Sequence, residues 1–154
     1  MNLRTASQVL GVARQLEDDA ARFYQSMSQT HATNGELFLG LAKQNKRNMM
    51  LIDRAYLGIS NDAFETGFCF DIDIDDSALG LEQSGCDGYS QCLEGAIEHE
   101  KKAGAFYSIA AEQSKSLLAG VTRTMVQIAG TKEDRLKTLI ALVATGSAQN
   151  TQGD

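Results

Sequence analysis

The sequence contains no proline, and proline is the residue that most often interrupts a helix, so long unbroken helices are favoured. It also has no N-terminal signal pattern and no apolar run near 18 residues. We therefore expect no membrane span and a cytoplasmic location. The formal net charge is −6 and no basic patch is present, which argues against a nucleic-acid partner.

Cysteine is scarce. Cys69, Cys86 and Cys92 are the three cysteines, and their spacing contains no Cys-x-x-Cys pair. An odd count without a secretory signal argues against a disulfide framework and against a rubredoxin-type iron site. We expect three free thiols, packed or incidental, that are not redox partners.

Amphipathic helical patterns dominate what is present. With 154 residues, 43% hydrophobic, the chain fits one ordinary folded domain. Apolar residues recur at steps of three and four over about 5–29, 35–57, 88–113 and 117–145. These patterns predict an all-α four-helix bundle of residues 1–145, followed by a flexible tail over 146–154. Asp87 is the predicted cap of the third helix.

A long connection separates the second helix from the third. Residues 59–87 lack helical periodicity, but Phe68, Phe70, Ile72 and Ile74 alternate with polar residues or cysteine. We predict an extended crossover that buries this Phe/Ile side and allows the second and third helices to run parallel.

A repeated motif relates the two halves of the chain. Residues 17–24 and 100–107 both read Glu-x-x-Ala-x-x-Phe-Tyr, at a constant offset of 83 positions (100 − 17 and 107 − 24). The motif places Glu17 and Glu100 in the middle of apolar stripes. A buried carboxylate is costly unless a cation, a metal or hydrogen-bond donors compensate its charge.

Six strongly polar residues occupy stripe positions that should be apolar, each near the middle of its helix. The first and third helices give one Glu each, and the second and fourth give a pair spaced i, i+3. A dinuclear carboxylate site inside a helical bundle has the same distribution. The six are Glu17, Asn45, Asn48, Glu100, Lys132 and Arg135.

Over roughly residues 5–145 the chain resembles the ferritin-like superfamily, most closely its rubrerythrin-like branch. The resemblance rests on the two Glu-x-x-Ala-x-x-Phe-Tyr motifs and on segments 41–48 and 128–135, which read Leu-Ala-x-x-Asn-x-x-Asn and Ile-Ala-x-x-Lys-x-x-Arg. The family pattern there is Leu-Ala-x-x-Glu-x-x-His. The resemblance implies a ferritin-like bundle, two irons used for peroxide reduction or ferroxidation, and assembly as a homodimer.

The departure from that pattern is large, because only Glu17 and Glu100 remain of six expected ligands. Two carboxylates now face Lys132 and Arg135, so the four charges balance. We predict a buried ion-pair network completed by amides from the second helix. Two alternatives stay open: the cations extend outward to solvent while the carboxylates bind tyrosines, or a metal survives on the two glutamates. We interpret Tyr24 and Tyr107 as core aromatics with bonded hydroxyls.

The sequence favours a non-catalytic binding or assembly module with a degenerate di-iron site and no cofactor. The alternative is a di-iron oxidoreductase or iron-binding protein with atypical ligands, so enzymatic activity stays open. A third reading is a calcium-responsive protein, because Asp71–Asp76 and Glu82 partly fit a calcium loop. An acidic edge that prevents strand pairing is the simpler interpretation of that loop. We expect His31 and His99 at the surface.

Overall fold

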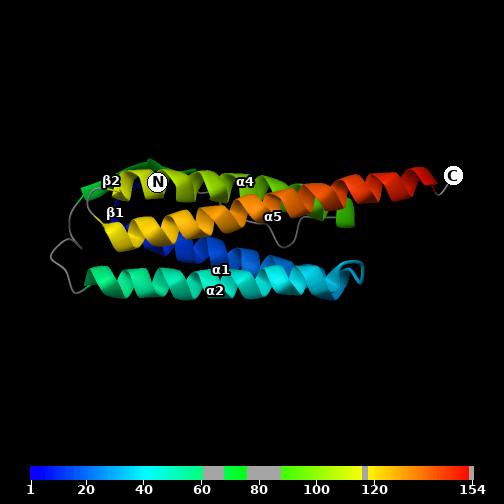
Figure 1. Ribbon diagram of the computed structural model, residues 1–154, viewed down its shortest axis with the longest axis horizontal. Helices are drawn as coiled ribbons and strands as arrows, with labels where there is room; N and C mark the ends of the chain where they lie inside the picture. The colour runs from blue at the N-terminus through cyan, green and yellow to red at the C-terminus, as the bar shows by residue number, and fades with distance from the viewer. Residues whose placement is uncertain (61–67, 76–87, 116–117, 153–154) are drawn as a thin grey trace.

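The computed structural model describes residues 1–60, 68–75, 88–115 and 118–152. Within these ranges the chain forms four long helices and a small sheet of two strands, so the predicted all-α four-helix class is confirmed (Figure 1). In chain order the elements are β1 (Asn2–Thr5), α1 (Ala6–Thr30), α2 (Gly35–Ser60), β2 (Phe68–Asp73), α4 (Tyr89–Ser114) and α5 (Ala119–Gln152).

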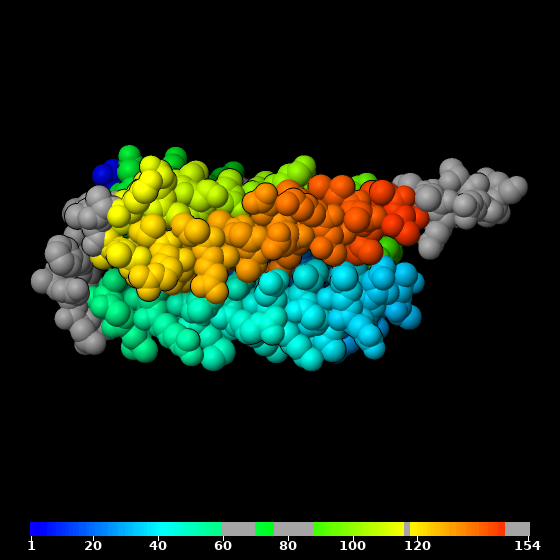
Figure 2. Space-filling view, in the orientation of Figure 1, coloured from blue at the N-terminus to red at the C-terminus, as the bar shows by residue number. Residues whose placement is uncertain are grey.

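The helices lie side by side along the long axis of the molecule (Figure 1). α1 packs mainly against α2, and α4 packs mainly against α5. The two pairs meet through contacts of α2 with α5 and of α1 with α4. α2 and α5 form one face of the elongated body (Figure 2). In the described ranges, none of the helices has the length and apolar character needed to span a membrane.

The two strands form an antiparallel ladder at one end of the helices. Leu3 pairs with Ile72, and Thr5 pairs with Phe68 across an irregularity. Phe70 and Ile72 are each 4% exposed, which confirms the predicted burial on this side of the connection. The expectation that acidic residues prevent strand pairing is wrong, because the backbone makes the ladder while the acidic side chains stay exposed.

The helix ends differ from the predictions in two places. α4 is capped by Gly88, whose φ of 104° favours glycine, and not by Asp87, which lies outside the described residues. α5 continues to Gln152, so the segment predicted as a tail from residue 146 is helical up to that point. The segment 146–152 contains no proline that would stop the helix.

The interior consists of two apolar clusters. One lies toward the sheet and includes Leu10, Phe106 and Ile128; the other lies toward the α1–α2 turn and includes Phe23, Phe38 and Leu139. On every helix the polar stripe residues fall between members of the two clusters. A polar layer therefore divides the core, and the candidate site is this layer.

Candidate functional site

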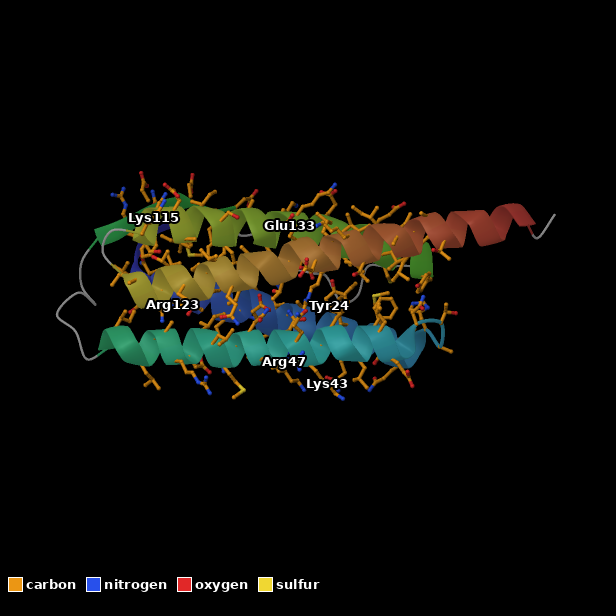
Figure 3. All side chains as sticks on the ribbon, viewed as in Figure 1. Tyr24, Lys43, Arg47, Lys115, Arg123 and Glu133 are labelled. Atoms are coloured by element: carbon orange, nitrogen blue, oxygen red, sulfur yellow. The ribbon has the colours of Figure 1, made fainter. Side chains whose placement is uncertain are left out.

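All six polar stripe residues are buried, although sequence reasoning left open that the two cations reach solvent. Their exposed fractions are Glu17 0%, Asn45 0%, Asn48 3%, Glu100 1%, Lys132 2% and Arg135 2%. The alternative in which the cations extend outward is therefore wrong. In Figure 3, Tyr24 lies between the helices at this level, whereas Lys43 and Arg47 point away from the outer side of α2.

The Glu17 carboxylate is contacted on both oxygens. Oε1 accepts a hydrogen bond from the Tyr107 hydroxyl at 2.7 Å and lies 2.8 Å from Lys132 Nζ. Oε2 accepts from Asn45 Nδ2 at 2.7 Å and from Asn48 Nδ2 at 3.1 Å. α1 thus supplies a charge that donors from the three other helices stabilise, as a buried carboxylate requires.

The Glu100 carboxylate has fewer partners. Oε1 accepts from the Tyr24 hydroxyl at 2.7 Å and from Arg135 Nη1 at 3.3 Å. Oε2 lies 3.7 Å from Lys132 Nζ and has no hydrogen-bond partner. Lys132 Nζ also has no hydrogen bond of favourable direction, although it lies 2.8 Å from Glu17. The predicted ion pairing is thus confirmed, with Lys132 paired to both glutamates and Arg135 to Glu100.

Arg135 ties α5 to α2. Its Nε donates to Gln44 Oε1 at 2.7 Å, Nη1 to Asn45 Oδ1 at 2.8 Å, and Nη2 to the Leu41 carbonyl oxygen at 2.9 Å. The guanidinium carbon also lies 5.6 Å from the centre of the Tyr24 ring, within range of a cation–π interaction. A buried guanidinium needs such a set of acceptors, and Arg135 finds them.

Sequence reasoning missed Gln44, and it missed Thr131, whose Oγ1 accepts from Asn48 Nδ2 at 3.4 Å. Both directly precede a residue of the predicted set, so a search one position beyond each apolar stripe would have found them.

The two tyrosines exchange partners between the repeats. Each lies seven residues after a glutamate in its own helix, yet Tyr24 of α1 donates to Glu100 of α4, and Tyr107 of α4 donates to Glu17 of α1. Burial, and then the neighbouring carboxylate, raise the pKa of both hydroxyls well above 10. Both tyrosines therefore stay protonated at neutral pH and keep donating. The two hydrogen bonds confirm the prediction that the hydroxyls are bonded.

Opposing effects act on Glu100. Burial by itself raises its pKa, but Lys132, Arg135 and the Tyr24 hydrogen bond together lower it below 4.5. Glu100 is therefore ionised at neutral pH. Together with Glu17 it balances the two positive charges of Lys132 and Arg135 across the layer.

His99 is buried, which corrects the prediction that it lies at the surface. It is 5% exposed, its Nε2 has no hydrogen-bond partner, and burial lowers its pKa from 6.5 to about 4. α4 contacts α5, β2 and α1, so its buried arc is wider than one stripe and includes this position. His31 is half-buried, with its ring 5.5 Å from that of Tyr89.

The expectation of three free thiols is wrong for Cys92. This residue is 3% exposed and disulfide-bonded, and its partner lies outside the described side chains. Motif spacing could not reveal this bond, because pairing depends on which segments meet in the fold. Disulfides persist mainly in oxidising compartments, so the bond argues against the cytoplasmic location that the sequence predicts.

The residues present do not fit the two irons that the resemblance implies. Within the described ranges, no group of three or more His, Cys, Asp or Glu residues could hold a metal. The amides and cations that replace the Glu-x-x-His motifs are poor or repulsive partners for iron, and Lys132 Nζ already lies against Glu17.

The acidic loop is only partly described. Asp71 accepts a hydrogen bond from Asn2 Nδ2 at 3.1 Å, and Asp73 lies 3.8 Å from the N-terminal amine. Both side chains therefore contact the N-terminal segment that pairs with β2. The remaining positions of the predicted calcium loop, from residue 76 onward, lie outside the described residues.

Comparison with known proteins finds no matching family model, no matching curated protein and no matching solved structure.

Proposed function

We propose that this protein is a ferritin-like four-helix bundle in which a buried network of ion pairs and amides has replaced the di-iron centre, leaving a non-catalytic binding or assembly module. The observation that carries the proposal is the set of contacts at the six expected ligand positions. Two carboxylates face two cations there, and Lys132 Nζ lies 2.8 Å from Glu17.

The arrangement of the helices supports the ferritin-like part of this proposal. α2 and α4 run in the same direction in Figure 1, as a crossover between them requires. The repeated motifs face each other across the core, since each tyrosine binds the glutamate of the other repeat. The polar layer lies mid-helix on all four helices, where bundle proteins carry metal sites.

The charge balance explains why the network can replace metals. In the family pattern, four carboxylates are neutralised by two divalent ions. Here two carboxylates are neutralised by one Lys and one Arg, and amides fill the remaining space. A cation fixed in the chain gives the same electrostatic compensation without depending on metal supply, and it leaves no open coordination site for redox chemistry.

Restoring the missing ligands tests this proposal. The quadruple variant Asn45→Glu, Asn48→His, Lys132→Glu and Arg135→His re-creates both Glu-x-x-His motifs. After anaerobic loading with Fe(II) and exposure to air, we expect the variant to hold about two irons per chain, with oxo-bridge absorption. The wild-type protein, loaded in the same way, should retain none. Two irons in the wild type, or none in a folded variant, would contradict the proposal.

We also propose a homodimer, with no nucleic-acid or membrane partner. The resemblance implies dimers, and the outer side of α2 leaves large apolar side chains exposed: Leu39 40%, Met50 56%, Tyr56 40% and Leu57 63%. Such patches are typical of protein interfaces. Light scattering should give the mass of two chains, and the double change Met50→Lys and Leu57→Lys should give the mass of one.

A further inference from the structure

The side of α4 that points away from the core carries a regular row of exposed residues. The row advances along the helix by steps of three and four, which keeps it on one face. Each end of the row carries a Glu followed by a Lys, and the middle carries two small residues. We call this row the α4 stripe, and its members are Glu98, Lys101, Ala105, Ser108, Glu112 and Lys115, all exposed.

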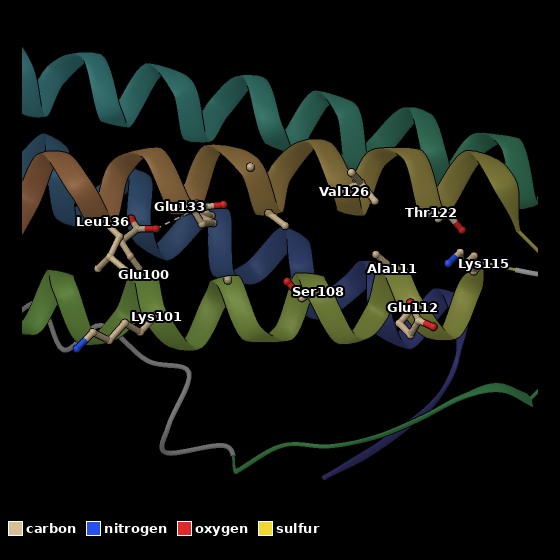
Figure 4. A pocket seen from close by; sticks show the side chains of 14 residues that line it. Glu100, Lys101, Ser108, Ala111, Glu112, Lys115, Thr122, Val126, Glu133 and Leu136 are labelled. Carbon is tan, nitrogen blue, oxygen red and sulfur yellow. Dashed lines mark ion pairs between the residues drawn. The ribbon is translucent and has the colours of Figure 1, made fainter.

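A groove between α4 and α5 lies beside the α4 stripe. Four members of the stripe also line this groove: Lys101, Ser108, Glu112 and Lys115. In Figure 4, Lys101 lies toward one end of the groove and Lys115 at the other, with Ser108 between them. Small residues in the middle of the stripe leave a shallow surface, so a second helix can approach α4 closely there.

The order of charges along the α4 stripe is complementary to its own reverse. An antiparallel copy of α4 that sets its Glu112 opposite Lys101 also sets its Lys115 opposite Glu98, because Glu and Lys are three residues apart at both ends. Two-fold symmetry repeats both contacts, so four pairs of opposite charge form. At the centre Ala105 faces Ser108, and two small side chains meet.

Other arrangements lose this match. In a parallel pair related by a two-fold axis, each residue of the stripe faces its own copy, so like charges meet at all four charged positions. Shifting the antiparallel pair by one heptad sets Glu112 opposite Ser108 and Lys115 opposite Ala105, so those charges face small residues instead. The pattern therefore specifies one direction and one register.

We infer that the α4 stripe is a self-association surface, on which α4 of a second copy of this chain docks antiparallel through four intermolecular Glu–Lys pairs. This inference rests on the proposed function as an assembly module and names the partner and the surface that it uses. Within one chain, Lys101 Nζ lies 3.5 Å from Glu98 Oε1, and both side chains are more than half exposed. An exposed pair of this kind contributes little to stability, so both groups can take a partner from the second copy.

The α4 stripe is separate from the apolar patch on α2 that we assign to the homodimer. α2 and α4 each contact both α1 and α5, and they lie on opposite sides of the molecule in Figure 1. Because its charges are exposed and its centre holds only small residues, the α4 contact is weak and sensitive to salt. It therefore joins molecules at high protein concentration and leaves the mass of the dilute protein unchanged.

Sedimentation velocity of the full chain at rising protein concentration tests the inference. At low salt, the mass of the wild type should double as the concentration rises to about 1 mM, where weak contacts become populated. This doubling is expected whether the dilute species contains one chain or two. At about 1 M salt the dissociation constant should rise at least tenfold, because screening shortens the range of the charges. A mass that stays constant at low salt would overturn the inference.

Two charge-reversed variants test the direction and register of the contact. Lys101→Glu with Lys115→Glu makes the charges of the stripe wholly acidic, and Glu98→Lys with Glu112→Lys makes them wholly basic. Each variant alone should keep its dilute mass at low salt, because every facing pair repels. An equimolar mixture should associate at least as tightly as the wild type. Association of either variant alone at wild-type strength, or a mixture that keeps the dilute mass, would overturn the inference.

A matched control separates the stripe from net charge. Lys102→Glu with Lys137→Glu changes the net charge as the acidic variant does, at exposed positions outside the stripe. All of these substitutions exchange one helix-favouring exposed residue for another, so the variants should fold, as circular dichroism can verify. The control should associate like the wild type. A control that loses association as completely as the acidic variant would overturn the inference.

The two proposals fail separately. A wild-type protein that takes up no iron and never doubles its mass would remove the α4 contact and leave the replaced metal centre in place. Uptake of two irons by the wild type would remove the proposed function whatever the sedimentation result.

Discussion

Glu17 and Glu100 occupy the same position of a repeated motif, yet their surroundings differ. Four donors contact Glu17 on both of its oxygens, from α2, α4 and α5. Glu100 has hydrogen bonds on one oxygen only, and its other oxygen lies 3.7 Å from Lys132 Nζ. Both carboxylates are buried, but one has hydrogen-bond donors on both oxygens and the other has them on one oxygen only.

The facing helices cause this difference. α2 presents two short amides, Asn45 and Asn48, to Glu17, and the longer Arg135 of α5 reaches Glu100. Arg135 donates to three acceptors on α2, so only part of the hydrogen-bonding capacity of Arg135 is left for Glu100. An internal repeat therefore predicts where a charge lies, while the partners on other helices decide how completely it is satisfied.

Removing each glutamate should show the largest effects. We expect Glu17→Leu to lower the free energy of unfolding by about 3–5 kcal/mol, because it takes the nearest counter-ion from Lys132 and the acceptor from two amides and Tyr107. Glu100→Leu should cost less, since Arg135 keeps three other acceptors. Urea unfolding followed by circular dichroism measures both. Equal losses, or the reverse order, would show that the contrast between the two sites is wrong.

His99, which directly precedes Glu100, should make the stability of the protein depend on pH. Its pKa is about 4 in the folded state and 6.5 as the reference, so between these values the unfolded chain binds a proton that the folded protein does not. Stability is therefore full above pH 6.5 and falls as the pH drops toward 4, by about 3 kcal/mol.

The lowered pKa of Glu100 adds a further loss as the pH falls through its folded value, below 4.5. Unfolding midpoints between pH 4 and 7 test this dependence, and His99→Leu should flatten it. An unchanged slope in His99→Leu would assign the dependence to other groups.

The tyrosine hydroxyls should give the smallest effects and the finest comparison. A hydrogen bond to a charged group contributes about 1.5–3 kcal/mol. Tyr24→Phe should fall near the upper end of this range, because Glu100 then keeps only Arg135 as a hydrogen-bond donor. Tyr107→Phe should fall near the lower end, because both amides still bind Glu17. Tyr24→Phe should also raise the pKa of Glu100, so its acid unfolding should begin at higher pH than that of Tyr107→Phe.

Much of the layer could be predicted from the sequence because it depends on helical periodicity. Polar residues at stripe positions are exceptional, so Glu17, Lys132 and the others could be identified without a structure. Burial of His99 could not, since it depends on how many elements pack around α4. The pairing of Asn2–Thr5 with β2 was missed because four residues are too few to show an alternating pattern. The disulfide at Cys92 depends on long-range contacts that spacing does not reveal.

The central claim is that a buried ion pair stands where a metal centre is expected, and a double-mutant cycle on Glu17 and Lys132 tests it most directly. Glu17→Gln and Lys132→Met each remove one charge with little change in shape. The surface pair Arg14 and Asp53, 3.0 Å apart and about half exposed, is the control, with Arg14→Met and Asp53→Asn.

We expect the buried double variant to be more stable than the sum of its single changes predicts, by at least about 2 kcal/mol. The surface cycle should show a coupling of about 0–1 kcal/mol. Additivity within about 0.5 kcal/mol at the buried pair would contradict the account.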